Sequence, residues 1–227
     1  MSSSARTPKL ARFYGFFTTY GRERLDGLDR SYFEGMAEEE LEEAWRHLAN
    51  RRFLDEESAY GLWLIDWERA VELFKRALAE PMETSLYPAE RDAIERARLQ
   101  LLAYVSSVEP DRDYVDAICG FASSEFEDVR AQFARTVSPR RLTPDIVDAL
   151  KAMILTESAR LALICAVNSF MGLYGMSGLD MDSCTKEIYL SLMSTDQDRK
   201  LAAIEQVRNQ QQAPAPADQA HGFFYRT

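Results

Sequence analysis

The residues best suited to metal binding or nucleophilic chemistry are few and scattered. The chain has two histidines, His47 and His221, which are far apart in the sequence. The three cysteines show no C-x-x-C spacing and do not lie at ligand spacing from a histidine; they are Cys119, Cys165 and Cys184. A zinc site needs several such ligands close together, so we expect no metal site. No phosphate-binding glycine loop, dinucleotide motif or nucleophile elbow is present, so we expect no cofactor and no catalytic residue.

Carboxylates are abundant, with 37 Asp and Glu residues, so their mere presence does not indicate acid–base chemistry. Asp66 is the one that stands out, because it lies between Trp63 and Trp67. Desolvation by two indoles would raise the pKa of its carboxyl group. A solvated or helix-capping role for Asp66 is the preferred interpretation.

Acidic residues also occur in short runs near the N-terminal end of the sequence. These runs are Glu38, Glu39, Glu40, Glu42 and Glu43, followed by Asp55, Glu56 and Glu57. They could be solvated helix faces, or they could form a docking surface for a basic protein. The net charge of −10 disfavours nucleic acid as a partner, because phosphate backbones are bound by basic surfaces.

Several features indicate a protein of a reducing compartment, and we expect a cytoplasmic location. The odd, dispersed cysteines do not predict a disulfide framework. The aromatic stretch near the N-terminus is interrupted by Gly15 and lacks the features of a signal peptide. The most apolar stretch, 161–176, is shorter than the ~20 residues that span a bilayer, so it predicts a buried core helix and no membrane partner.

Hydrophobic spacing predicts helices over most of the chain. The first clear ones cover 37–50, 58–79 and the segment from Pro88 to just before Pro110. Residues 1–8 are predicted to be a disordered end, and 9–35 receive no firm assignment. After a single helical domain over 9–208, the polar, proline-containing segment 209–227 is predicted to be a flexible tail.

Three helix pairs recur in the second half, over 113–137, 143–171 and 182–208. Ser124 with Glu127, and Thr195 with Asp198, have the spacing of helix caps, and Thr143 precedes a proline suited to a first helical turn. The second helices of these pairs carry arginines, namely Arg130, Arg160 and Arg199, for which a structural role is the preferred interpretation. Helix pairs that recur every 30 to 40 residues are typical of α-solenoids.

The stretch "FEDVRAQFARTV", residues 126–137, resembles the second-helix pattern of the HEAT-repeat family, in which Val-Arg precedes small residues. The resemblance covers 113–208 best. Phe133 and Leu163 depart from it, because the family usually has alanine there, and the usual Asp-Pro is missing. The resemblance implies an all-α fold, a short α-solenoid of HEAT-like helical hairpins with an irregular helical N-terminal part.

A solenoid implies a binding surface shared by successive second helices. Here those helices carry Asp128, Gln132, Arg135, Arg160 and Lys200 at positions predicted to be exposed. The leading hypothesis is a non-enzymatic interaction protein, because a small, acidic helical-repeat chain is similar to bacterial immunity proteins that neutralise a basic toxin by direct binding. An adaptor or assembly factor remains an alternative, and a HEAT-like lyase or DNA glycosylase is less favoured. The predicted partner-binding residues are the eight carboxylates of the acidic runs together with Asp128, Gln132 and Arg135.

Overall fold

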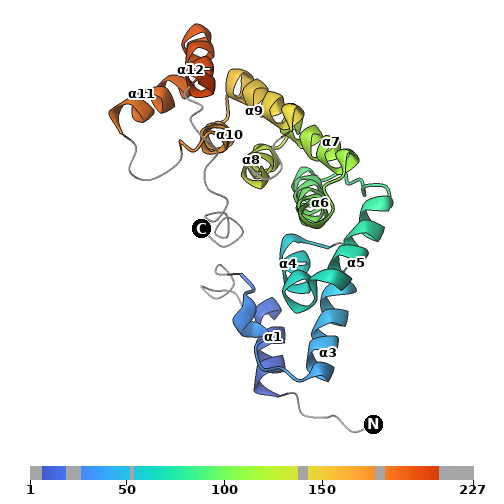
Figure 1. Ribbon diagram of the computed structural model, residues 1–227. Helices are drawn as coiled ribbons and strands as arrows, with labels where there is room; N and C mark the ends of the chain where they lie inside the picture. The colour runs from blue at the N-terminus through green and yellow to red at the C-terminus, as the bar shows by residue number, and fades with distance from the viewer. Residues whose placement is uncertain (1–6, 19–26, 52–53, 138–142, 177–181, 210–227) are drawn as a thin grey trace. The chain divides into compact units, whose positions relative to one another are not determined.

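The computed structural model describes residues 7–18, 27–51, 54–137, 143–176 and 182–209. Within these ranges the regular secondary structure is helical throughout and contains no strand, which confirms the predicted all-α class (Figure 1). The described residues belong to two compact units, Met1–Tyr114 and Val115–Thr227. Whether these units behave as the single domain predicted for 9–208 stays a prediction.

Unit 1 contains five α-helices and one short 3-10 helix within its described residues. Their bounds are α1 Pro8–Thr18, η1 Arg30–Tyr32, α3 Glu38–Ala49, α4 Glu56–Ile65, α5 Trp67–Ala79 and α6 Pro88–Val108. The segment 9–35, which had no firm assignment, thus contributes α1 and η1. Helix α3 confirms the prediction for 37–50, and Pro88 opens α6 at the position where its missing N–H costs nothing.

The prediction of one continuous helix over 58–79 was wrong, because the chain breaks at Asp66. The backbone of Asp66 is extended, with φ −158° and ψ 96°, so the residue ends α4 and begins α5. Its carboxylate accepts a hydrogen bond from the Arg69 amide at 3.0 Å. This is the capping role preferred for Asp66, and it supplies an acceptor for one of the four free N–H groups of the first turn of α5.

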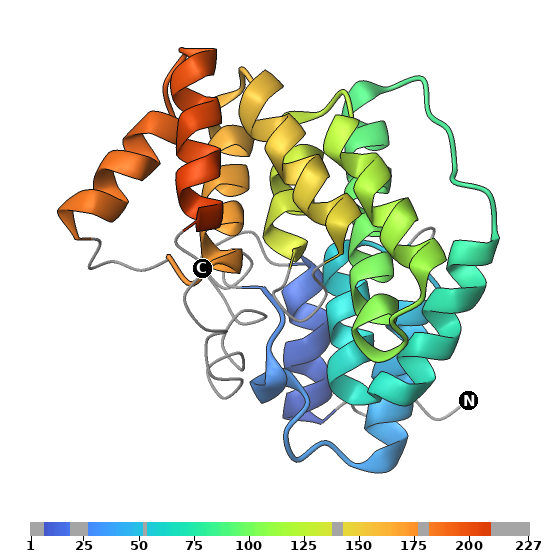
Figure 2. The ribbon, with the colours of Figure 1, turned by 45° about the horizontal axis from the view of Figure 1, so that its top comes forward.

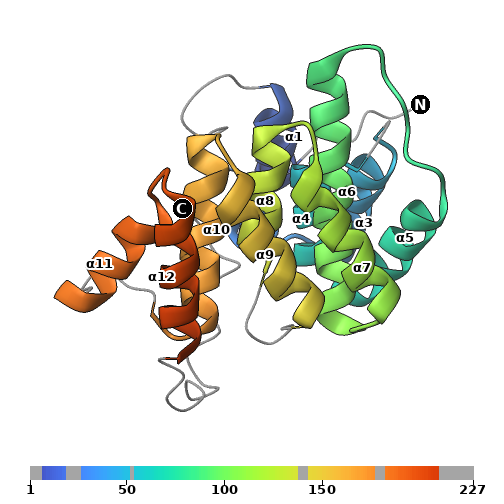
Figure 3. The same cartoon turned by 90° about the horizontal axis from the view of Figure 1, so that it is seen from above.

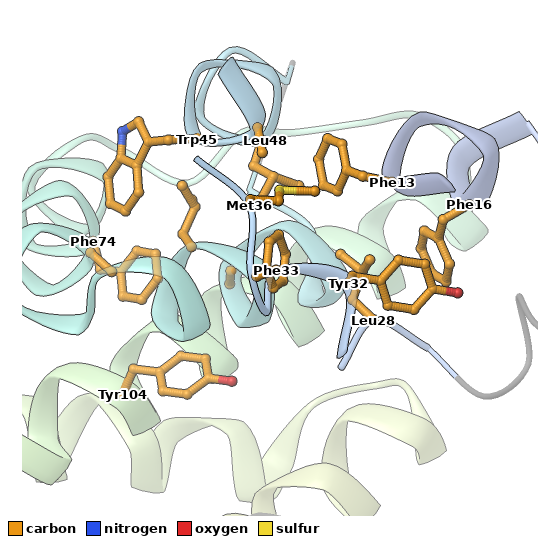
Figure 4. Packing of buried hydrophobic residues seen from close by; sticks show 14 of the residues in the cluster. Phe13, Phe16, Leu28, Tyr32, Phe33, Met36, Trp45, Leu48, Phe74 and Tyr104 are labelled. Carbon is orange, nitrogen blue, oxygen red and sulfur yellow. The ribbon is translucent and has the colours of Figure 1, made fainter. Parts of the chain in front are cut away.

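The core of unit 1 is an aromatic cluster to which every α-helix of the unit contributes (Figure 4). Between ring centroids, Phe16 of α1 lies 5.5 Å from Tyr32 and Phe13 lies 5.8 Å from Phe33. Phe74 of α5 lies 5.6 Å from Tyr104 of α6. Large buried rings supply most of the apolar area that a small unit can remove from water. The N-terminal segment is therefore part of this core.

Unit 2 consists of consecutive helices, of which two successive pairs pack together. It contains the end of α7 (Arg112–Gly120), η2 (Phe121–Ser123), α8 (Glu127–Thr136), α9 (Pro144–Thr156), α10 (Arg160–Leu173), α11 (Ser183–Leu192) and α12 (Gln197–Asn209). Helix α9 packs on α10 and α11 packs on α12, while α8 and α10 lie side by side (Figures 2 and 3). The helix bounds correspond to those predicted over 113–137, 143–171 and 182–208, and whether the three segments are repeats stays a prediction.

Two of the three predicted caps were wrong in detail. The N-cap position of α8 is Phe126, without a side-chain cap, and the Ser124 hydroxyl accepts from the Phe126 amide instead. At α12 the capping carboxylate is that of Asp196, which accepts from the Arg199 amide at 3.1 Å. Thr143 does cap α9, as its neighbouring proline suggested.

Helices α8 and α10 approach closely because small side chains face each other. Ala131 and Ala134 of α8 and Ala162 and Ala166 of α10 are fully buried. The Ser169 hydroxyl of α10 donates to the Ala134 carbonyl at 2.6 Å, which joins side chain to backbone across the contact. The small residues of the HEAT-like pattern therefore serve helix packing.

We predict that Ala134→Leu lowers the free energy of unfolding by about 1–3 kcal/mol, because added methyl groups have no space in this contact. The matched control is Ala152→Leu, the same substitution at an exposed position of α9. Denaturant unfolding of both variants measures the difference. Equal stability of the two variants would show that α8 and α10 are not closely packed.

Candidate interaction surface

The first turn of α3 places three carboxylates where the positive end of the helix dipole favours them. Glu38 and Glu39 are exposed. Glu40 instead accepts hydrogen bonds from the Thr7 hydroxyl and, at 2.8 Å, from the Ala37 amide, and these bonds hold the pKa of its carboxyl group below the usual value. Glu40 therefore connects the start of α3 to the residue before α1.

The next carboxylate of α3, Glu42, is paired with Arg69 of α5. The guanidinium donates two hydrogen bonds to it, at 2.5 and 3.1 Å, and also lies 4.2 Å from the centroid of the Trp45 ring. The hydrogen bond from Arg69 lowers the pKa of Glu42 and raises that of Arg69. Exposed pairs of this kind contribute little to stability, but they orient the side chains toward each other.

The remaining acidic residues of the two runs also contact the body of unit 1. Glu43 accepts from the Tyr14 hydroxyl at 3.0 Å, and Glu56 pairs with Arg96 at 3.2 Å. Asp55 caps α4 by accepting from the Ser58 amide at 2.8 Å, and Glu57 is half-buried. Of the eight carboxylates predicted to bind a partner, the two most exposed residues are thus Glu38 and Glu39.

An open hollow of about 580 Å³ lies beside the second half of α3. Its lining residues are Tyr14, Glu43, Arg46, His47, Asn50 and Arg51. The imidazole of His47 is surrounded by the rings of Phe13, Tyr14 and Phe17, with centroids at 5.6, 4.9 and 5.0 Å. The hollow offers guanidinium groups beside a carboxylate, so it can hydrogen-bond to polar side chains of a protein. No sequence pattern predicted this hollow, because Tyr14 and His47 are brought together only by the packing of α1 on α3.

The residues predicted on the second helices of unit 2 differ in their exposure. Asp128, Arg135 and Arg160 are exposed, and Gln132 is half-buried. Lys200 was predicted to be exposed, and this was wrong, since only 4% of it is accessible. Its ammonium group donates to the Ile154 carbonyl at 2.5 Å, so it is held against the C-terminal end of α9, where a cation is favoured. Burial lowers the pKa of Lys200, partly offset by the nearby charge of Glu157.

Arg130 has the structural role that was preferred for it. Its Nε and Nη2 donate to the Glu157 carboxylate at 2.6 and 3.1 Å, and its Nη1 donates to the Ser124 carbonyl at 2.7 Å. Burial raises the pKa of Glu157, but the hydrogen bonds from Arg130 and from the Ala159 amide outweigh it and leave the pKa below its usual value. Arg130 thereby joins α8 to the turn between α9 and α10.

A second group of exposed carboxylates lies on unit 2, at Asp116, Asp145 and Asp148. Two of them lie near the Cys119 thiol, because burial, then the charge of Asp145, then that of Asp116 raise its pKa to about 11. Asp148 follows Asp145 by three residues on α9 and pairs with Lys151 at 3.0 Å. We call Asp116, Asp145 and Asp148 the unit 2 acidic patch. The sequence did not reveal it, since Asp116 is separated from the other two by an entire helix and two connections.

The part of the chain that the structure describes contains no cluster of three or more His, Cys, Asp or Glu residues suited to hold a metal ion. None of its helices is both long and apolar enough to cross a membrane. In comparisons with family models, curated proteins and solved structures, nothing matches this chain. The resemblance to HEAT repeats therefore stays a prediction.

We predict that Glu157→Gln costs about 3 kcal/mol of unfolding free energy near pH 7, because it removes the carboxylate that is hydrogen-bonded to the largely buried Arg130 guanidinium. The pKa of Glu157 is lower in the folded state, so its stabilising effect is complete above its unfolded pKa of about 4.3 and is lost as the pH falls through the folded value. The difference from wild type should shrink below about pH 4.

Urea unfolding at a series of pH values, with Glu187→Gln at an exposed position as control, measures this difference in unfolding free energy. A difference that does not vary with pH contradicts this role of Glu157.

We predict that the thiols react unequally with iodoacetamide. A pKa of about 11 leaves roughly one Cys119 thiol in 3,000 ionised at pH 7.5, and Cys165 is buried. Cys184 is exposed and should be alkylated first. Peptide mass spectrometry over a time course follows each site. If Asp145→Asn together with Asp116→Asn leaves the labelling rate of Cys119 unchanged, these carboxylates do not act on the thiol.

Proposed function

We propose that the protein is a non-enzymatic interaction protein that binds a basic protein partner directly. The observation that carries the proposal is that acidic side chains stay exposed on both units after the internal ion pairs have formed. In unit 1 they include Glu38 and Glu39, and in unit 2 they include Asp116 and Asp145 of the unit 2 acidic patch. The third member of that patch, Asp148, is exposed but pairs with Lys151 at 3.0 Å. The molecule as a whole is also negatively charged, with a net charge of −10, and this charge speeds its encounter with a positively charged surface.

The internal pairs narrow the surface that a partner can use. Glu42 and Glu56 are held by Arg69 and Arg96, so using them would require breaking contacts within unit 1. Glu38 and Glu39 require no such rearrangement, because they project from the first turn of α3. A partner that binds them can also reach the hollow beside the same helix.

The partner we propose is a toxin of the same bacterium, which would make the chain an immunity protein acting in the cytoplasm. The proposal is supported by the acidic charge, the stacked helical pairs of unit 2 and the three free cysteines. Tight binding to the toxin would neutralise it by covering its active surface. An adaptor or assembly factor would use the same surface, but it would bind without rescuing cells from a toxin.

We predict that Glu38→Lys with Glu39→Lys weakens binding to the basic partner at least about tenfold at low salt, mainly through slower association. The matched control, Glu187→Lys with Asp198→Lys, makes the same change of charge at exposed positions of unit 2. Surface plasmon resonance with the toxic product of a neighbouring gene, at two salt concentrations, measures both rates.

Co-expression provides the cellular test of the same proposal. Cells that produce the toxic neighbour should survive when the wild-type chain is co-expressed, and should survive less well with the Glu38→Lys, Glu39→Lys variant. If no neighbouring gene product is toxic in the absence of this chain, the immunity role is wrong. If rescue occurs and the double variant binds like wild type, the first turn of α3 is not the docking surface.

A further inference from the structure

The connection between α5 and α6, residues 80–87, presents apolar side chains to solvent. Leu86 is 96% exposed and Tyr87 is 72% exposed, and Met82 is exposed as well. Figures 2 and 3 both show the teal-green connection running apart from the two helices that it joins. Single exposed apolar residues are ordinary on protein surfaces, but a group within one short loop indicates a site of interaction.

The loop is held at its start by Arg98 of α6. The guanidinium donates to the Leu78 carbonyl at 2.6 Å and to the Glu80 carbonyl at 2.9 Å, and it also reaches the Ala77 carbonyl at 3.4 Å. These are the last carbonyls of α5 and the first of the loop, which lack partners within the helix. Arg98 therefore sets the direction in which the chain leaves α5.

The end of the loop is also held in place. The Ser85 hydroxyl accepts from the Tyr87 amide at 3.1 Å and donates to the Glu90 carboxylate at 2.6 Å. Pro81 and Pro88 restrict the backbone at the two ends of the segment. A loop ordered in this way loses little conformational entropy on binding, so its exposed leucine and tyrosine are preorganised for insertion into a pocket.

The charge of the segment specifies the kind of surface that fits it. Residues 80–90 contain Glu80, Glu83 and Glu90 and neither lysine nor arginine. Such a segment is repelled by anionic lipid and by acidic proteins, and it is attracted to a pocket with a basic rim. We infer that residues 80–87 form a docking loop that inserts Leu86 and Tyr87 into an apolar pocket, rimmed by basic residues, on the protein partner. This inference rests on the proposed function, because it assigns the same partner a second contact.

The docking loop and the first turn of α3 should respond differently to salt. Contacts made by Glu38 and Glu39 are weakened by screening, whereas burial of Leu86 is not. If the docking loop contributes to binding, we therefore expect the affinity for the partner to persist in about 0.5 M salt.

The test begins with a photo-crosslinking residue, p-benzoylphenylalanine, placed in the full chain at Leu86, at Glu39 or, as control, at Leu190, which is exposed on α11. In the native cells we expect the Leu86 and Glu39 positions to crosslink the same basic protein and the Leu190 position not to do so. That protein, identified by mass spectrometry and purified, is then titrated with the variants.

We predict that Leu86→Ala raises the dissociation constant about 10-fold at low and at high salt alike, as expected for an anchor residue. Leu86→Asp should raise it about 30-fold at high salt, where attraction of the new carboxylate to the basic rim is screened. Leu190→Asp should stay within about twofold of wild type. Because Leu86 is almost fully exposed, its variants should fold normally, and thermal unfolding checks this.

The remaining outcomes separate the two proposals. A partner that crosslinks at Glu39 but not at Leu86, and that binds Leu86→Asp like wild type, overturns the docking loop and leaves the proposed function intact. The absence of any crosslinked protein at either position overturns both. Sedimentation of the wild-type chain with phosphatidylserine–phosphatidylcholine vesicles, lost in Leu86→Asp, would make the loop a membrane contact and would also overturn the inference.

Discussion

The ends of helices are the constraint on which much of this structure depends, because their last carbonyls need hydrogen-bond donors. Three cationic side chains supply them from a later helix: Arg98 bonds the end of α5, Lys200 bonds the end of α9, and Arg130 bonds the Ser124 carbonyl after η2. Each of these bonds joins two helices and leaves a charged group partly or fully shielded from water. Shielding a charge is costly, so these positions tolerate few other residues.

The acidic side chains of this protein have two distinct uses. Glu157 and Glu42 neutralise guanidinium groups inside a unit, whereas Glu38 and Glu39 remain exposed at a helix start. A residue's type alone does not distinguish these uses, since all four are glutamates on or next to helices. The distinction comes from which helix packs opposite, and it decides which carboxylates a partner can reach.

The candidate surfaces share one design, in which an exposed group is presented by a well-ordered element. Glu38 and Glu39 project from the first turn of α3, and the backbone on either side of Leu86 is held by Arg98 and by Ser85. Preorganised contacts of this kind lower the entropic cost of association. They are consistent with the role in tight binding that we propose.

The sequence by itself determined the helical class, the positions of most helices in the second half and the capping role of Asp66, because these depend on hydrophobic spacing and on local hydrogen bonds. It did not reveal the break that Asp66 makes in the helix predicted over 58–79, since the apolar spacing continues across that residue. Only the tertiary structure decided that Lys200 is buried, that Glu42 and Glu56 are paired, and that Asp116 and Asp145 both lie near the Cys119 thiol. These facts depend on residues far apart in the chain, and the spacing of side chains along one helix does not specify what packs against it.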